Sequence, residues 1–146
     1  MSSTSLKLFI RESGDPAGPQ VVFLHGGPLS SRMWQPQLER LTEMHCLAPD
    51  LPGHGENNPD DPFTLKEAAH QVAELIRERT PEGKAAVVGL SLGGAVALTL
   101  LREEPQVVDR AMLSGSAARL DKFTGQLSMM TSSPLRAVPV EKKAEM

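Results

Sequence analysis

The residues that most constrain this chain are Gly-Leu-Ser-Leu-Gly at positions 89–93, because they join a segment with the pattern of a β-strand to a segment with the pattern of a helix. Residues 84–89 form a short apolar run with the character of a buried strand, and residues 92–103 form an apolar stretch of helical length. A strand that reverses directly into a helix places the central residue, Ser91, in a strained backbone conformation. Glycines two positions before and after it let neighbouring segments pass close by. The pentapeptide therefore predicts a tight strand-to-helix turn with a serine hydroxyl at its tip.

A G-x-S-x-G turn in this context is a nucleophile elbow. Ser91 is then the candidate nucleophile. The amide of Leu92 lies at the start of the helix, so it is a candidate donor to an oxyanion. The alternative interpretation is an incidental turn rich in glycine and serine. The placement between a strand and a helix favours the functional interpretation.

Two further loops follow predicted strands. The sequence His-Gly-Gly-Pro at 25–28 comes after the apolar run 21–24. Because Pro28 has no N–H, the amide of Gly27 is the candidate second oxyanion donor. His25 is interpreted first as a structural hydrogen-bonding residue and only second as a base. The third loop, Asp-Leu-Pro-Gly-His-Gly at 50–55, is interpreted as a rigid connection.

The order of segments predicts the fold class. Strands are expected at 5–11, 21–24, 45–48, 84–89 and 107–114, and helices at 31–44, 65–79 and 92–103. Residues 12–20 are a turn cluster, and Thr64 with Glu67 fits a capping box at the start of the second helix. This alternation is typical of an α/β protein with a mostly parallel sheet and helices on both faces.

Composition excludes several other classes. The chain has 146 residues, enough for one domain, and its net charge of −3 lacks the basic excess of a nucleic-acid-binding protein. The most apolar stretch, 85–101, is interrupted by glycine and serine and does not resemble a membrane span. The single cysteine, Cys46, excludes an internal disulfide and suits the reducing cytoplasm, where we expect the protein to reside. A nucleotide-binding domain is poorly supported, because neither G-x-G-x-x-G after a strand nor a P-loop occurs.

The motifs together carry a resemblance to a known family. HGGP, W-x-P-Q-L, DLPGHG and GLSLGG, in this order and spacing, resemble the α/β-hydrolase superfamily over roughly residues 5–120. HGGP is also similar to proline iminopeptidases, but their elbow usually carries Trp after the serine, where this chain has Leu92. GLSLGG is closer to small esterases and enol-lactonases. The resemblance implies transfer of an acyl group from a carboxylic ester or lactone to water through an acyl-serine, with no cofactor and no metal.

The catalytic pattern of that superfamily breaks off in this chain. Its triad runs Ser, then Asp or Glu, then His, whereas all four histidines here precede Ser91. The strand at 107–114 ends in Ser114-Gly115-Ser116, with no carboxylate there, and Asp121 is the nearest acid after it. His25 and His54, on loops at the same end as Ser91, are the candidate substitute bases. We therefore expect residues 1–146 to form one incomplete hydrolase core, the N-terminal half of the fold, with 115–146 as the start of a cap segment or a rearranged tail.

Two functions from different classes follow. The first is a serine hydrolase impaired by the missing triad acid and histidine. The second is a catalytically inert half-fold that acts as a structural or self-associating module. Because a fold that stops here leaves the strand 107–114 as an open edge, we expect association with a second copy or with a missing C-terminal half. The expected contact is that strand or the segment after Gly115, and the simplest assembly is a two-fold dimer.

Overall fold

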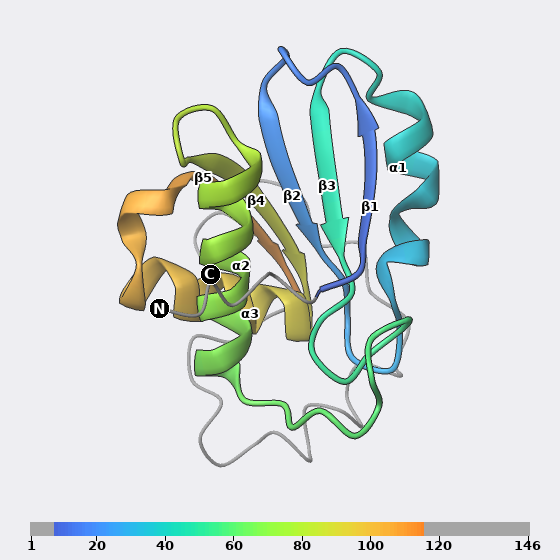
Figure 1. Ribbon diagram of the computed structural model, residues 1–146, viewed down its shortest axis with the longest axis vertical. Helices are drawn as coiled ribbons and strands as arrows, with labels where there is room; N and C mark the ends of the chain where they lie inside the picture. Colours follow the sequence, from blue (N-terminus) through green and yellow to red (C-terminus); the bar gives the residue numbers. More distant parts are fainter. Residues whose placement is uncertain (1–7, 116–146) are drawn as a thin grey trace.

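The computed structural model describes residues 8–115 and contains five strands, three α-helices and two 3₁₀ helices in that range (Figure 1). In chain order the elements are β1 (Ile10–Gly14), β2 (Gln20–Leu24), η1 (Ser31–Trp34), α1 (Gln35–Arg40), β3 (His45–Pro49), α2 (Leu65–Arg79), β4 (Ala85–Leu90), α3 (Leu92–Glu103), η2 (Pro105–Val107) and β5 (Val108–Ser114).

The strands form one mixed sheet in the order β1-β3-β2-β4-β5. Strand β1 runs antiparallel to β3, and every other neighbouring pair is parallel. The predicted α/β class with a mostly parallel sheet is therefore confirmed. Because β2, β3 and β4 are parallel, the loops that follow them leave from the same end of the sheet.

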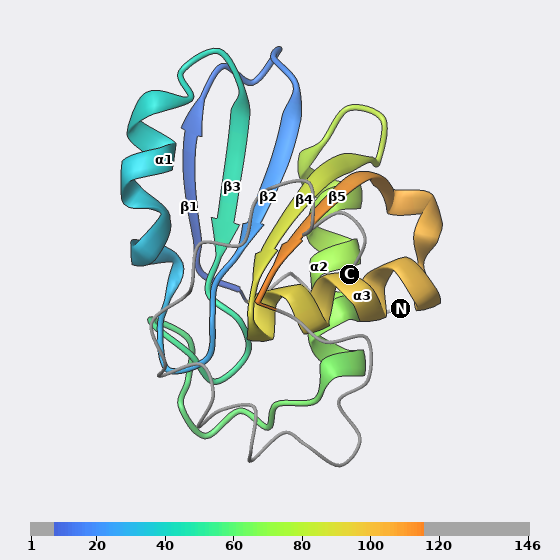
Figure 2. The same ribbon diagram turned by 180° about the vertical axis from the view of Figure 1, so that it is seen from behind.

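Helices pack on both faces of the sheet. On one face, α2 and α3 enclose the larger apolar cluster, which includes Val22, Leu24, Val72, Val87 and Val96. On the other face, η1 and α1 cover a smaller cluster in which Trp34 packs on Phe23, with 5.0 Å between the ring centroids. In Figure 2, β4 and β5 face the viewer and neither α1 nor α2 lies in front of them. Within residues 8–115, the face with α2 and α3 thus carries the larger apolar cluster, and α1 does not reach over β4 and β5 on the other face.

The second helix forms as its sequence predicts. Thr64 has an extended backbone, and its hydroxyl accepts a hydrogen bond from the amide of Glu67 at 3.1 Å, which satisfies one of the donors at the helix start. The predicted apolar stripe faces the core: five of its six members are buried (Ala68, Ala69, Val72, Leu75, Ile76), and Leu65 packs against them. No helix within residues 8–115 is both long and apolar enough to span a membrane.

Two predicted boundaries were wrong. The first strand extends to Gly14 instead of ending at residue 11, because residues 12–14 pair with β3 (Gly14 with His45). Residues 5–7 lie outside the described range. The predicted helix 31–44 is shorter and of two kinds: a 3₁₀ turn ends at Trp34, and α1 ends at Arg40. Pro36, at the start of α1, has no N–H to donate to the preceding turn, so the two helices do not merge.

Strand β5 is the outermost strand on one side of the described sheet, and it pairs only with β4. Its middle residues, from Asp109 to Met112, are exposed, and Met112 is 66% exposed. The expectation of an open edge at this strand agrees with the described part of the fold. The expectation of a cap segment or tail at 115–146 lies outside the described residues beyond Gly115.

Candidate active site

Ser91 forms the sharp turn between β4 and α3. Its backbone has φ 51° and ψ −109°, and it is the only non-glycine residue with positive φ in the described part of the chain. Its amide donates to the carbonyl of Ser114 at 2.7 Å, and its carbonyl accepts from the amide of Ala95 at 3.0 Å. An unfavourable conformation of this kind persists only where its surroundings hold it in place. The strained turn predicted from G-x-S-x-G is therefore present.

The two glycines of the elbow are required by close packing. A Cβ on Gly89 would lie 2.5 Å from the carbonyl oxygen of Gly93, and a Cβ on Gly93 would lie 2.1 Å from that of Leu24. Both distances are shorter than real carbon–oxygen contacts. The lack of a side chain at Gly89 therefore lets the strand turn tightly onto the start of α3, and the lack of one at Gly93 lets α3 lie against the end of β2.

The loop at 25–28 lies beside the elbow, because β2 and β4 are neighbouring strands. A Cβ on Gly26 would lie 3.6 Å from the carbonyl oxygen of Leu90, the residue before Ser91. Gly27 borders open space, since a Cβ there would meet no atom within 4 Å. Leu92 is the first residue of α3, where backbone amides point out of the helix. The amides proposed from sequence as oxyanion donors thus come from adjacent loops at one end of the sheet.

His25 braces these loops. Its side chain is buried, its Nδ1 donates to the carbonyl of Gly26 at 2.7 Å, and its Nε2 accepts from the amide of Leu51 at 3.0 Å. Burial is the main cause that lowers the pKa of His25. The nearby His54 ring adds to this effect, and the Gly26 carbonyl and Asp50 partly oppose it. A neutral imidazole with this tautomer satisfies both contacts, so the ring joins the first loop to the third.

His54 lies next to His25, with 5.3 Å between the ring centroids, and its ring meets Phe63 edge-on at 5.5 Å. Its Nδ1 donates to the carbonyl of Pro52 at 2.9 Å. In the neutral ring this bond leaves the lone pair on Nε2. Both histidines named from sequence as substitute bases lie at this end of the sheet, and both carry the proton on Nδ1; they differ in that His25 Nε2 accepts from the Leu51 amide.

Asp50 has a structural role that sequence reasoning missed. Its buried carboxylate accepts from the amides of Ser31 at 2.7 Å and Glu56 at 2.8 Å. Burial, the largest single influence, raises the pKa of Asp50, but the hydrogen bonds from Glu56 and Ser31 together outweigh it and lower the pKa. Gly55 has φ +55°, and a Cβ there would collide with this carboxylate at 2.1 Å. The spacing of an aspartate and two later glycines in DLPGHG was the signal for this braced loop.

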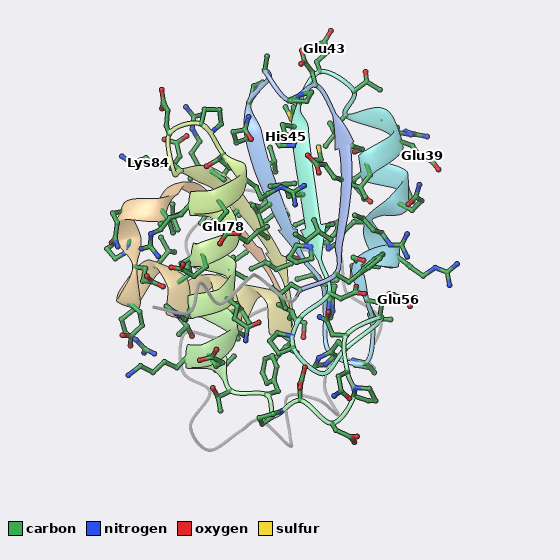
Figure 3. The ribbon with its side chains drawn as sticks, viewed as in Figure 1. Glu39, Glu43, His45, Glu56, Glu78 and Lys84 are labelled. Atoms are coloured by element: carbon green, nitrogen blue, oxygen red, sulfur yellow. The ribbon has the colours of Figure 1, made fainter. Side chains whose placement is uncertain are left out.

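The other two histidines lie elsewhere. His45 is buried at the opposite end of the sheet from Glu56, as Figure 3 shows, and its ring contacts Glu12 at 2.5 Å and Gln20 at 2.5 Å. His70 is on α2, 3.7 Å from Glu104. Neither residue belongs to the loops around Ser91.

The comparisons with known proteins agree with this geometry. The sequence model of the alpha/beta hydrolase family matches residues 21–143. The chain is 34% identical to Lipase LipV of Mycobacterium tuberculosis over 133 residues, which cover 89% of this chain and 51% of the lipase. It is 35% identical to the pimeloyl-[acyl-carrier protein] methyl ester esterase of Pseudoalteromonas atlantica, covering 73% of this chain and 40% of that protein.

Among solved structures, a thermophilic esterase from Thermogutta terrifontis superposes with a TM-score of 0.74 at 31% identity, over 83% of this chain and 44% of that one. The chain belongs to the alpha/beta hydrolase family. It spans about half, or less, of the length of the relatives described here.

Proposed function

We propose that the chain is a serine hydrolase that cleaves carboxylic esters or lactones through an acyl intermediate on Ser91. The observation that carries this proposal is the strained backbone of Ser91 at the elbow, held beside the 25–28 loop. Related proteins named as lipases and esterases support the substrate class. The hydroxyl of Ser91 would attack the carbonyl carbon, and the alcohol would leave with a proton.

The negative charge that develops on the carbonyl oxygen needs donors fixed in advance. We assign this role to the amides of Gly27 and Leu92, which come from the two adjacent loops. Their placement costs no rearrangement during the reaction, because the glycines of the elbow and the His25 bonds already hold both loops.

The general base is the weak point of this site. No histidine follows Ser91 in the sequence, so without a partner chain the candidate bases are His25 and His54. The imidazole of His25 is occupied at both nitrogens by backbone groups, whereas His54 Nε2 carries the lone pair in its tautomer. We therefore favour His54 over His25 as a substitute base, and expect impaired turnover with either.

The competing function is a catalytically inert half-fold that acts as a structural or self-associating module in the cytoplasm. The open edge of β5 and the exposed Met112 favour association with a second copy or with a chain that supplies the rest of the sheet. In the second case the partner would also bring the acid and the histidine, and the site would be shared between two chains.

The dependence of ester hydrolysis on pH tests the proposal. With p-nitrophenyl acetate, we expect slow turnover that rises steadily with pH, about 10²–10⁴-fold below an intact family member, because general-base help is missing. Ser91→Ala should abolish the acyl-enzyme seen by intact mass. Full activity in that variant would show that hydrolysis belongs to another residue.

A plateau above neutral pH would instead show that a histidine acts as base. His54→Ala and His25→Ala, measured separately, then identify it as the variant that loses the plateau. We expect His54→Ala to do so, and His25→Ala to reduce stability.

A further inference from the structure

A depression of about 490 Å³ lies next to the elbow. It is lined by Pro28, Leu29, Ser30, Arg32, Met33 and Gly55. The side chain of Leu29 lies 3.6 Å from where a Cβ of Gly26 would stand, and this same point is 3.6 Å from the carbonyl oxygen of Leu90. The side chain of Leu29 therefore lies on the same side of Gly26 as Leu90, the residue before Ser91, and the lining residue Pro28 directly follows Gly27 in the chain.

Much of the lining of this depression is apolar. Leu29 is 49% exposed, which is unusual for a leucine beside a packed sheet end, and Pro28 is exposed next to it. The sulfur of Met33 accepts from the amide of Gly26 at 3.5 Å, so the methionine is fixed against the 25–28 loop. An aliphatic group of a ligand would fit against these three side chains.

Arg32 is the only charged residue in the lining. Its amide donates to the hydroxyl of Ser30 at 3.3 Å, which fixes the backbone of η1. Within residues 8–115, no carboxylate lies within 4 Å of the Arg32 guanidinium.

Two other charged residues close to this segment have fixed partners. The Arg11 Nε donates to the hydroxyl of Ser31 at 3.1 Å, and its guanidinium lies over the Phe9 ring. The carboxylate of Asp50 is buried beneath the loops and accepts two amides. Glu56, which follows the lining residue Gly55 in the chain, is exposed.

We propose that this depression is a subsite for the part of the ester that is remote from the scissile carbonyl, and that it selects a short aliphatic group ending in a carboxylate. The aliphatic part lies along Leu29 and Met33, and the carboxylate pairs with Arg32. This assignment rests on the proposed function of Ser91 for its reaction, but the binding itself does not require turnover.

Two matched probes test the subsite: monomethyl glutarate, which carries one carboxylate, and dimethyl glutarate, which carries none. Their binding is followed by ¹H–¹⁵N NMR at the amides of Leu29, Met33 and Gly55. We expect tighter binding of the monomethyl ester, weakened by up to about fivefold in Arg32→Gln, the upper range for an exposed ion pair. The control is Arg40→Gln, at the far end of α1, which should bind both probes as the wild type does.

Equal affinity for the two esters, wild-type binding by Arg32→Gln, or shifts confined to other residues would overturn the subsite. Failure of the proposed reaction gives a different result. If binding depends on Arg32 but p-nitrophenyl acetate forms no acyl-serine, the subsite stands and Ser91 is not the nucleophile. Since Arg32 is exposed, its substitution should leave the far-ultraviolet circular dichroism spectrum unchanged.

Discussion

The loops at the end of β2, β3 and β4 and the outer side of β5 belong to one sheet, but they differ in how completely their groups are satisfied. At the loop end, His25 and Asp50 each use both polar atoms of the side chain to hold neighbouring backbone. At β5, four consecutive residues are exposed and the described sheet ends. The difference indicates that the loops proposed to hold the nucleophile and the oxyanion donors are braced by contacts within residues 8–115, whereas the described sheet ends at an exposed strand.

The largest expected effect breaks the elbow itself. In Gly93→Ala the new Cβ would lie 2.1 Å from the carbonyl oxygen of Leu24, so β2 and α3 must separate. We expect a loss of about 3 kcal/mol or more in the free energy of unfolding, measured by urea denaturation. The matched control is Gly27→Ala, where a Cβ meets open space. Equal destabilisation by the two substitutions would show that the elbow is not packed as described.

The next effect removes the brace under the loops. Asp50→Ala leaves the amides of Ser31 and Glu56 without their carboxylate, which should cost about 2–3 kcal/mol of unfolding free energy. The control is Asp60→Ala, at an exposed position, which should change stability little. Because hydrogen bonds hold the pKa of Asp50 low, its contribution is present above about pH 4 and is lost as the pH falls through the folded value. If the difference in unfolding free energy between the wild type and Asp50→Ala stays constant down to pH 2, this assignment is wrong.

A smaller effect appears near neutral pH. Burial lowers the pKa of His25 in the folded chain, so the unfolded chain takes up a proton there first as the pH decreases below about 6.5. The free energy of unfolding should then fall by at most about 1.4 kcal/mol per pH unit from this residue, until the pH passes the folded value. His25→Gln should flatten the profile in this range. An unchanged slope in His25→Gln would show that His25 accepts a proton freely in the folded chain.

Most of the fold was predictable from the sequence because its signals are local. The Thr64 cap, the apolar stripe of α2 and the bounds of α3 depend on near neighbours in the chain, and each was predicted correctly. The error at β1 came from a distant partner: residues 12–14 have turn composition, but pairing with β3 extends the strand. At the site, G-x-S-x-G predicted the strained Ser91, whereas the role of Asp50 depends on Ser31 and was not visible from periodicity.

The smallest effect on stability concerns β5, the second of the two regions compared above. If the open edge of β5 associates, the protein should be a two-fold dimer at micromolar concentration, and Met112→Lys should shift the mass measured by light scattering toward one chain. Because Met112 is 66% exposed, the substitution should change the unfolding free energy of the monomer by no more than about 0.5 kcal/mol. A folded wild-type protein with the mass of one chain would refute the dimer.

The most direct test of the central claim is covalent labelling of the wild-type chain with a fluorophosphonate, followed by peptide mapping. The geometry at the elbow predicts one adduct, on Ser91, which forms faster as the pH rises and is absent from Ser91→Ala. The matched control is Ser114→Ala, a nearby serine whose substitution keeps the backbone carbonyl that accepts from the Ser91 amide at 2.7 Å; this variant should still form the adduct on Ser91. Absence of any adduct, or an adduct on a serine other than Ser91, would contradict the claim that this half of the fold holds a working nucleophile.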